Sequence, residues 1–348
     1  MVCWLRTKVA LITNSRPDSI KLSVILPCFN GASTIAVQLD ALTQQAWPAG
    51  WEVIVVNNGS TDHSMDIVKT YSHRLPNLSI VEAYLPGTTR LGVPHSYNAG
   101  IKAATGDAFV FCEADDEVAP DWLAAMGRAL TQHEFVAARL DHRKLNEAWM
   151  HPPVGDGYQS QELFRQPSFP HFVSASACGF GLRRELYETL GPLDVNFPIV
   201  HDGEYCWRAQ LAGYSVHFET EALVYYREKS DMKARYRQGL AWGRETMRMN
   251  HYYGSPQGRF SLPRQFCSMA RSLPSGAKAL LFWAFRRPDG KQLLGNWVWS
   301  WGWSTGKLLL ALENRTLPQR EGLAAAFAAI KQISPPAETP AQGMQSLR

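Results

Sequence analysis

The sequence lacks the features that mark three other classes of protein. Its six cysteines are scattered, and no two of them have the Cys-x-x-Cys spacing of zinc ligands, so a zinc site is not expected. No stretch reaches the roughly 18 consecutive apolar residues that a membrane-spanning helix needs. The net charge of +4 is small for 348 residues, and nucleic acid is therefore not an expected partner.

Cysteine usage and the first residues indicate a cytoplasmic location. Cys28 and Cys112 lie at the ends of apolar runs, where a small thiol packs well, and we expect reduced thiols there. Residues 1–20 contain no long apolar region and no small-residue cleavage site. We therefore expect a loosely ordered extension and not a signal peptide.

The composition is that of a globular protein, and the first half of the chain alternates between two periodicities. Apolar residues make up 45% of the chain and charged residues 19%, which is normal for a protein with a full core. The expected strands are residues 22–26, 51–56, 78–83 and 108–112. The expected helices are residues 33–45, 62–68, 93–104 and 119–130. This alternation predicts an α/β fold with a Rossmann-like, mainly parallel central sheet flanked by helices.

Beyond residue 140 the pattern changes. Residues 143–170 are polar and rich in proline and glycine, which predicts a surface excursion. Further expected elements are strands at 173–182, 215–218 and 222–226 and helices at 184–190 and 201–212. The expected parts of the chain are an N-terminal extension (1–20), a main α/β domain (21–230), a helical C-terminal region (231–333) and a disordered tail (334–348).

An acidic cluster follows the expected strand at 108–112. Glu113, Asp115 and Asp116 lie within four residues, and like charges this close disfavour one another's ionisation. A divalent cation would remove that repulsion, and Mn²⁺ and Mg²⁺ prefer such oxygen ligands. The alternative is a solvated loop that caps the next helix, but capping needs only one acidic residue. Because ligands bind beyond the carboxyl ends of parallel strands, the position favours a metal site.

Five segments, in order, resemble the motifs of the family 2 glycosyltransferases, which have the GT-A fold. They are residues 24–30 (VILPCFN), 55–62 (VVNNGSTD), 97–107 (YNAGIKAATGD), 113–116 (EADD) and 201–214 (HDGEYCWRAQLAGY). The resemblance spans about residues 22–228. It implies a GT-A catalytic domain, here with a helical C-terminal extension.

The resemblance also implies a reaction and the residues that carry it. The reaction is inverting transfer of a sugar from a UDP, GDP or dTDP donor to a hydroxyl of a glycan or lipid-linked acceptor, as in cell-surface polysaccharide biosynthesis. Mn²⁺ or Mg²⁺ would assist the leaving diphosphate. The implied nucleotide-sugar contacts are Pro27, Phe29, Asn30, Asn58 and Asp115. The implied metal ligands are Asp116 and Asp115, and the implied general base is Asp202.

The chemistry of inversion agrees with a single catalytic carboxylate. One in-line attack needs one base, on the face opposite the leaving diphosphate, and no enzyme nucleophile. Asp202 is the best candidate, and Glu204 is the alternative. Asp202 taken alone would be a first-turn helix residue favoured by the helix dipole. The other four motifs favour its catalytic role.

The sequence departs from the family's pattern in three ways, at four positions. Asn57 and Asn58 replace a frequent pair of aspartates. An amide oxygen can still accept a hydrogen bond from a nucleotide base, but it adds no charge, so the identity of the nucleotide base in the donor is left open. Glu113 replaces an aspartate and is therefore a less certain metal ligand than Asp116. Arg227 stands where some members carry a histidine, and it is either a bidentate phosphate donor or a surface arginine.

For two further residues, Gly179 and Trp207, a role in the site and a purely structural role are both open. Gly179 lies in a small-residue segment resembling the acceptor-side strand of the family, where it would let substrate approach the backbone; ordinary close packing is the alternative. Trp207 would line an acceptor pocket or belong to the core.

The C-terminal region combines tryptophan with basic residues. Tryptophan occurs at 297, 299, 301 and 303, an apolar run at 277–285 precedes two arginines, and residues 235–248 are basic. These features favour peripheral contact with the inner face of a membrane, where a lipid-linked acceptor would lie. Alternate tryptophans do not fit one helical face, so a helical subdomain packed on the catalytic core is the other interpretation.

Two other functions are possible on such a sheet. A nucleotidyltransferase-like enzyme would carry a basic, glycine-rich loop after the first strand, but residues 28–31 contain no lysine or arginine. A non-catalytic module that binds sugar nucleotides or glycans would not need to keep Asp115, Asp116 and Asp202.

Overall fold

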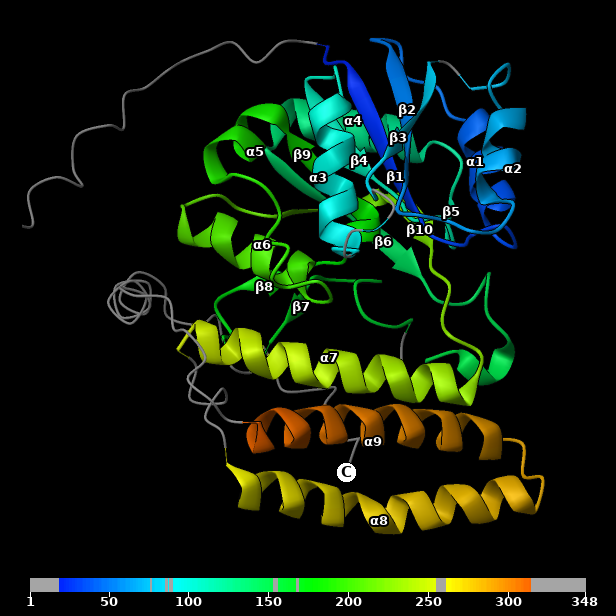
Figure 1. Cartoon of the computed structure of the whole chain (residues 1–348), viewed down its shortest axis with the longest axis vertical. Coiled ribbons are helices and arrows are strands. Elements are labelled where there is room, and N and C mark those ends of the chain that lie inside the picture. The colour runs from blue at the N-terminus through cyan, green and yellow to red at the C-terminus, as the bar shows by residue number, and fades with distance from the viewer. Residues whose placement is uncertain are drawn as a thin grey trace, which may run out of the picture.

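The computed structural model describes residues 19–75, 77–84, 87, 90–152, 156–166, 169–254 and 261–313. Within them lies an eight-stranded sheet with the order β3-β2-β1-β4-β9-β6-β10-β5 (Figure 1). The parallel strands are β1 (Leu22–Cys28), β2 (Trp51–Asn57), β3 (Leu78–Glu82), β4 (Ala108–Phe111), β6 (Phe135–Asp141) and β10 (His217–Tyr225). The antiparallel strands are β9 (Phe180–Arg183) and β5 (Glu117–Val118). The predicted α/β class with a mainly parallel sheet is confirmed.

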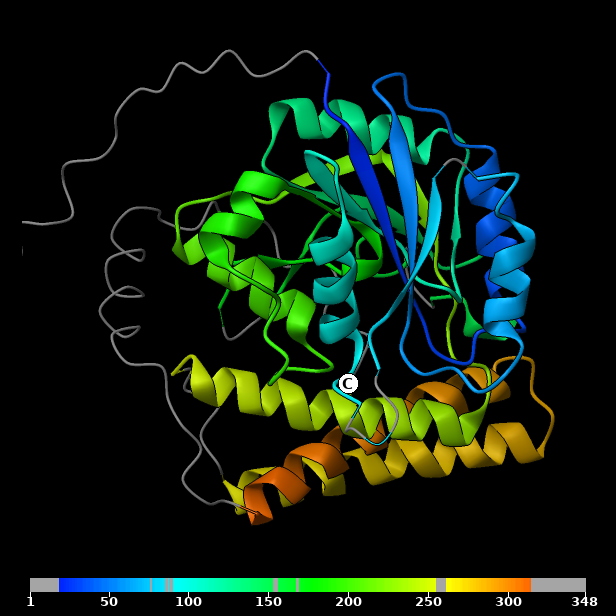
Figure 2. The same cartoon turned by 45° about the horizontal axis from the view of Figure 1, so that its top comes forward.

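Helices cover both faces of this sheet. One face packs on α1 (Ile35–Thr43), α2 (Ser64–Thr70) and α4 (Trp122–Gln132). The other face packs on α3 (Val93–Ala103), α5 (Arg184–Leu190) and α6 (His201–Leu211), as the turned view in Figure 2 also shows. Burial on both sides explains why the first two strands are continuous apolar runs instead of alternating ones.

Two strand predictions in the second half were wrong in detail. The single strand expected at 173–182 is broken into β8 (Val173–Ser174), a 3₁₀ turn at Ala177–Gly179 and β9. The two strands expected at 215–218 and 222–226 form one strand, β10, whose register shifts between Glu219 and Leu223. A β-bulge of this kind adds residues on one strand without ending it, so the pattern in the sequence looks interrupted.

The excursion expected on the surface at 143–170 is partly buried. Gln159 lies in the interior, where its Nε2 donates to Ala138 O at 2.8 Å and its Oε1 accepts from Ser176 N at 2.7 Å. Strand β7 (Phe164–Arg165) pairs with β8. A polar residue can enter a core when its hydrogen bonds are satisfied, and composition alone does not reveal this.

The helical C-terminal region contains α7 (Met232–Tyr252), α8 (Leu262–Ala284) and α9 (Gly290–Leu312). Asp231 caps α7 by accepting a hydrogen bond from Ala234 N at 2.8 Å. The part built on the central sheet, α7, α9 and α8 lie one below the other in Figure 1, with α8 outermost. Among the described residues, no helix is both long and apolar enough to cross a bilayer.

Contact between α7 and α9 depends on glycine. A Cβ atom added at Gly239 or Gly243 of α7 would lie 2.2 or 2.1 Å from a carbonyl oxygen of α9. A Cβ added at Gly302 or Gly306 of α9 would lie 2.3 or 2.0 Å from a carbonyl oxygen of α7. The backbones of α7 and α9 therefore touch directly. Helix α9 is thus packed closely against α7, which in turn packs on the part of the chain built around the central sheet.

The ends of the chain fall largely outside the described residues. Of the expected extension at 1–20, only Ser19 and Ile20 are described, and Ile20 is buried in the core. The packed domain therefore begins before residue 21. The expected tail at 334–348 lies outside the described residues.

Candidate active site

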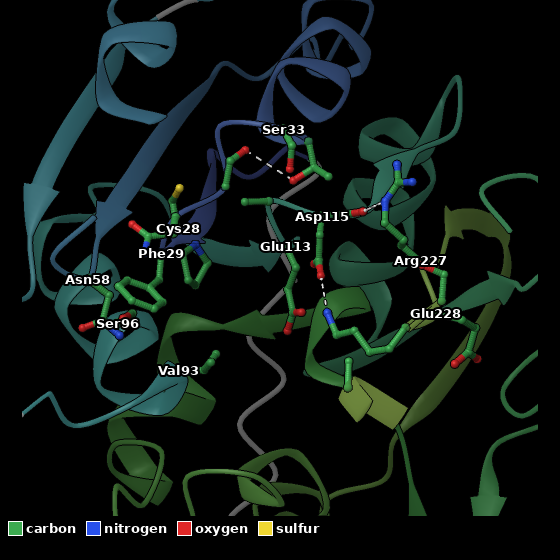
Figure 3. A pocket seen from close by; sticks show the side chains of 18 of the residues that line it. Cys28, Phe29, Ser33, Asn58, Val93, Ser96, Glu113, Asp115, Arg227 and Glu228 are labelled. Carbon is green, nitrogen blue, oxygen red and sulfur yellow. Dashed lines mark hydrogen bonds and ion pairs between the residues drawn. The ribbon is translucent and has the colours of Figure 1, made fainter. Parts of the chain in front are cut away.

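A first cavity of about 500 Å³ lies at the carboxyl ends of β1, β2 and β4 (Figure 3). This is the edge at which a parallel sheet collects the polar residues that follow its strands. Of the residues predicted for the site, it is lined by Pro27, Phe29, Asn30, Asn58, Glu113, Asp115 and Arg227. In Figure 3, Phe29 and Asn58 lie on one side of Glu113 and Asp115, and Arg227 lies on the other.

Asn30 joins the first two strand-end loops. It has a positive φ of 50°, which asparagine tolerates better than most residues. Its Oδ1 accepts from Thr61 N at 2.8 Å, and its own N–H donates to Ser60 Oγ at 3.1 Å. Asp62, the first residue of the helix expected at 62–68, also joins these loops, because its Oδ2 accepts from Ala32 N at 3.0 Å. Asn30 thus shapes this end of the cavity.

Asn58 and Phe29 line the cavity beside these loops, and Arg90 contacts both of them. The Oδ1 atom of Asn58 is buried and has no hydrogen-bond partner among the described residues, so an acceptor is available there. Phe29 is 46% exposed, and the Arg90 guanidinium lies 3.7 Å from the centre of its ring. Arg90 Nε also donates to Asn58 O at 2.9 Å. Arg90 was not predicted, because it lies in a loop without a recognisable motif.

The acidic cluster is compact, and two of its members, Glu113 and Asp115, line the first cavity. Ligand atoms of Glu113, Asp115 and Asp116 all lie within 4.8 Å of one another. Asp116 is only 1% exposed; its Oδ1 accepts from Arg227 N at 2.8 Å, and its Oδ2 has no partner among the described residues. Lys229 Nζ lies 2.9 Å from Asp115 Oδ2. Lys229 also lines the cavity and was missed, although it is only two residues beyond the predicted Arg227.

Burial makes these carboxylates hard to ionise. Burial and then the charge of Asp115 raise the pKa of Glu113 from 4.5 to about 8. The same causes, in the same order, raise the pKa of Asp116 well above 3.8. Negative charge on Glu113 and Asp116 is therefore unfavourable unless a cation compensates it. Asp116 Oδ2 also lacks a hydrogen-bond partner among the described residues, and both observations fit a site for a divalent cation. The residues present therefore agree with the predicted metal ligands.

A second cavity of about 710 Å³ adjoins the first and contains Asp202. Asp202 lies in the first turn of α6, where its Oδ1 accepts from Gly203 N at 2.7 Å. Burial raises the pKa of Asp202, and the neighbouring His201 and backbone N–H groups lower it again in part. Glu228 lines both cavities, and the charge of Asp202 contributes to the raised pKa of Glu113. Asp202 is therefore close to the acidic cluster.

Helices from the C-terminal region complete the second cavity. Trp242 comes from α7, and Trp299 and Trp303 come from α9. The rings of Trp299 and Trp303 are 5.2 Å apart, and those of Trp297 and Trp301 form a separate pair at 5.4 Å. The four tryptophans thus make two helical faces, each with a spacing of four residues. That spacing is visible in the sequence and was the missed signal for a tryptophan wall.

Four predicted residues line neither cavity, namely the buried Asp116 described above and three others. Glu204 is buried in an ion pair with Arg208 at 3.0 Å and accepts from Tyr253 OH at 2.9 Å. A Cβ added at Gly179 would lie 3.0 Å from Ala138 Cβ, and Trp207 is fully buried with its Nε1 donating to a serine at 3.0 Å. The structure gives all three a packing role.

Comparison with known proteins gives the family. Residues 23–191 match the family model described as glycosyl transferase family 2. The uncharacterized glycosyltransferase YibD of Escherichia coli is 31% identical over 140 residues, which cover 40% of this chain and 38% of YibD. Glycosyltransferase AglE of Haloferax volcanii is 27% identical over 211 residues, which cover 58% of this chain and 65% of AglE. The chain thus matches less than two thirds of the length of each of these relatives.

A solved structure shows the same fold. The mannosyltransferase PcManGT from Pyrobaculum calidifontis, in complex with GDP-Man and Mn²⁺, superposes with a TM-score of 0.53 and 20% sequence identity. The match covers 91% of this chain and 82% of PcManGT, including the C-terminal helices of this chain. The central sheet, its flanking helices and the family match leave one conclusion, which is that residues 23–191 of this chain are a family 2 glycosyltransferase domain and that the chain has the GT-A fold.

Proposed function

We propose that this enzyme moves a sugar from a nucleotide-diphosphate donor to a hydroxyl of a glycan or lipid-linked acceptor, with inversion at the anomeric carbon. The observation that carries the proposal is the pair of adjoining cavities. One contains the acidic cluster, the other contains Asp202, and Glu228 lines both. A donor and an acceptor can therefore meet between the cluster and a single carboxylate, which is the arrangement that inversion requires.

The first cavity is proposed to hold the donor. Phe29 and Arg90 offer an aromatic face and a cation for the base, and the free Oδ1 of Asn58 can accept a hydrogen bond from a base N–H. Arg227 and Lys229 are the cations nearest the acidic cluster and would bind the diphosphate. The donor class remains UDP, GDP or dTDP.

Asp116 and Asp115, with Glu113 beside them, are the proposed ligands of Mn²⁺ or Mg²⁺. When bound, the ion neutralises negative charge that develops on the leaving diphosphate. The unpartnered Asp116 Oδ2 supports this assignment. PcManGT was solved with GDP-Man and Mn²⁺, which agrees with both the donor type and the metal.

Asp202 is proposed as the general base. It accepts the proton of the acceptor hydroxyl, the acceptor oxygen forms a bond to the anomeric carbon, and the electron pair of the broken C–O bond leaves with the diphosphate. Glu204 is not a comparable candidate, because its ion pair with Arg208 holds it away from the cavity. Trp299 and Trp303 give the acceptor aromatic surfaces against which the apolar face of a sugar ring can pack.

A cytoplasmic location with peripheral contact to the inner face of the membrane is the remaining part of the proposal. The described cysteines are all free, and four of the five are buried. A chain of this kind that acts on lipid-linked acceptors would work beside the bilayer.

The substitution Asp202→Asn tests the mechanism. It should reduce transfer by a factor of roughly 100 or more, since a positioned base contributes about 10²–10⁴-fold. Donor binding should remain, and it is measured by thermal shift with UDP, GDP and dTDP, each with and without Mn²⁺. Asp156→Asn, on an exposed loop, is the matched control and should leave transfer unchanged. Full transfer by the Asp202 variant would remove this residue from the mechanism.

A further inference from the structure

The outermost helix of the C-terminal region, α8, uses only one face for packing. On that face, the Trp297 indole lies so close to Gly276 that an added Cβ would come within 2.3 Å of it. Trp297 Nε1 also donates to Ser272 O at 3.0 Å. The main partner of α8 among the described helices and strands is α9, with Leu262 at the start of α8 also packing near Met247 of α7, and the face directed away from α9 lies on the outside of the molecule (Figure 1). It is exposed along the whole helix.

The exposed face of α8 is apolar. Phe266, Leu273 and Leu280 recur every seven residues, which places them in one row, and they are 56%, 53% and 47% exposed. Exposed alanines at 270, 277 and 284 lie in the same row, and Leu281 and Phe285 widen it. A contiguous apolar row of this length is unusual on the surface of a globular protein and marks an interaction site.

A row of positive charge also lies on the exposed surface of α8. Arg264, Arg271 and Lys278 recur every seven residues, each two positions before a residue of the apolar row, which places them nearly half a turn around the helix from Phe266, Leu273 and Leu280. Arg286 and Arg287 follow at the end of the helix, and no aspartate or glutamate occurs in α8. None of these five cations forms an ion pair with any residue that the structure describes. Their charge is therefore available to a partner.

We propose that the outer face of α8 is a docking surface for an anionic lipid bilayer. A helix with an apolar face, a basic flank and no acidic residue lies in the plane of a membrane interface, with the apolar side in the headgroup and acyl boundary. Basic residues add attraction to anionic headgroups. A second copy of this chain would present the same positive row and would be repelled by it. Crossing of the bilayer is not part of the proposal, since α8 does not meet the requirements for it.

This surface replaces the tryptophans as the membrane contact. Trp299 and Trp303 line the second cavity and Trp297 packs on α8, so these three are used inside the protein. Helix α9 separates α8 from the second cavity, and packed helices lie about 8–10 Å apart. Docking through α8 would therefore hold the acceptor cavity close to the bilayer. The inference extends the membrane contact in the proposed function, but lipid binding does not depend on the reaction.

Co-sedimentation of the full chain with vesicles tests the proposal. Binding is measured with vesicles of phosphatidylglycerol and phosphatidylcholine and with vesicles of phosphatidylcholine alone. The triple variant Arg264→Glu, Arg271→Glu, Lys278→Glu should lose roughly tenfold or more of its partition onto the anionic vesicles, since each basic residue near the surface contributes measurably. A second triple variant, Phe266→Ser, Leu273→Ser, Leu280→Ser, should lose binding as well.

The control is a triple variant with the same change of charge on the catalytic domain, at Lys69, Lys102 and Arg128. It should bind as the unchanged chain does. Equal loss in this control and in the α8 charge variant would overturn the proposal, as would absence of wild-type binding to the anionic vesicles. Self-association through α8, seen as a dimer without lipid that the serine variant abolishes, would overturn it too. Transfer to a water-soluble acceptor without vesicles separates the two proposals, because loss of transfer counts only against the proposed function.

Discussion

Individual side chains of the acidic cluster link proton binding, metal binding and stability. Asp116 is buried and Glu113 is partly buried beside Asp115. Among the described residues, the half-exposed Lys229 pairs with the Asp115 carboxylate, whereas the Arg227 guanidinium donates only to the Asp115 carbonyl oxygen. A buried carboxylate without full compensation stays protonated, which removes the charge. The folded protein is therefore most stable when these carboxylates bind protons, and the proposed cation would take the place of the protons.

The metal-free protein should lose stability as the pH rises. The pKa of Glu113 is about 8 in the folded chain and 4.5 in an unfolded one, and that of Asp116 is raised in the same direction. Between pH 4.5 and 8 the folded state therefore binds more protons, so the free energy of unfolding falls with pH across this window. Melting temperatures in EDTA at several pH values measure the effect.

Two additions complete that measurement. Mn²⁺ should restore much of the lost stability near pH 8, because it replaces the protons that the cluster releases. The variant Glu113→Gln should flatten the metal-free dependence, since an amide does not titrate. A melting temperature that rises from pH 5 to pH 8 in EDTA, with Glu113 intact, would contradict this account.

The sequence predicted most of the individual residues that line the first cavity. Pro27, Phe29, Asn30 and Asn58 were predicted to meet the acidic cluster, and all of them line the first cavity with it, because they follow neighbouring parallel strands. Arg90 and Lys229 could not be placed in the same way. They lie in loops whose path depends on tertiary contacts, such as that of Arg90 with Phe29.

Among the helices, α7 and α9 pack so closely that their contact leaves no room for a side chain larger than that of glycine. Alanine in place of glycine normally stabilises a helix by about 0.8–1 kcal/mol. At Gly302 and Gly306 the added methyl groups would instead meet carbonyl oxygens of α7. The variants Gly302→Ala and Gly306→Ala should therefore lower the free energy of unfolding by roughly 1–3 kcal/mol, which is typical of overpacking.

Urea unfolding measures this difference. Ser268→Ala places the same side chain on the exposed face of α8 and is the control, with little expected change. A stabilising effect of alanine at Gly302 would mean that the two backbones are farther apart than the structure has them. The pairs of glycines and tryptophans, each four residues apart, are readable in the sequence, but only the packed helices show which face each pair occupies.

For the whole molecule, the important feature is that the second cavity has walls from two parts of the chain. Asp202 lies on α6, which packs on the central sheet, whereas Trp242 and Trp299 come from α7 and α9, and all three residues lie beyond the residues 23–191 that match the family model. Pattern analysis predicted the α/β fold but could not predict this cavity, because the helices approach Asp202 only after the chain has folded back. The family match therefore predicts the residues of the first cavity better than those of the second.

Substitution of the tryptophan wall should separate acceptor binding from donor binding. Trp299→Ala and Trp303→Ala remove aromatic surface from the cavity that contains Asp202, and each should lower kcat/KM for the acceptor by roughly tenfold, since aromatic packing contributes about 0.5–1.5 kcal/mol beyond its buried area. The KM for the donor should not change. Trp301→Ala is the control, because Trp301 lies on the same helix but pairs with Trp297 and does not line the cavity. Equal effects at Trp299 and Trp301 on acceptor kinetics would mean that α9 acts only through stability, and the acceptor would then have to be sought elsewhere around Asp202.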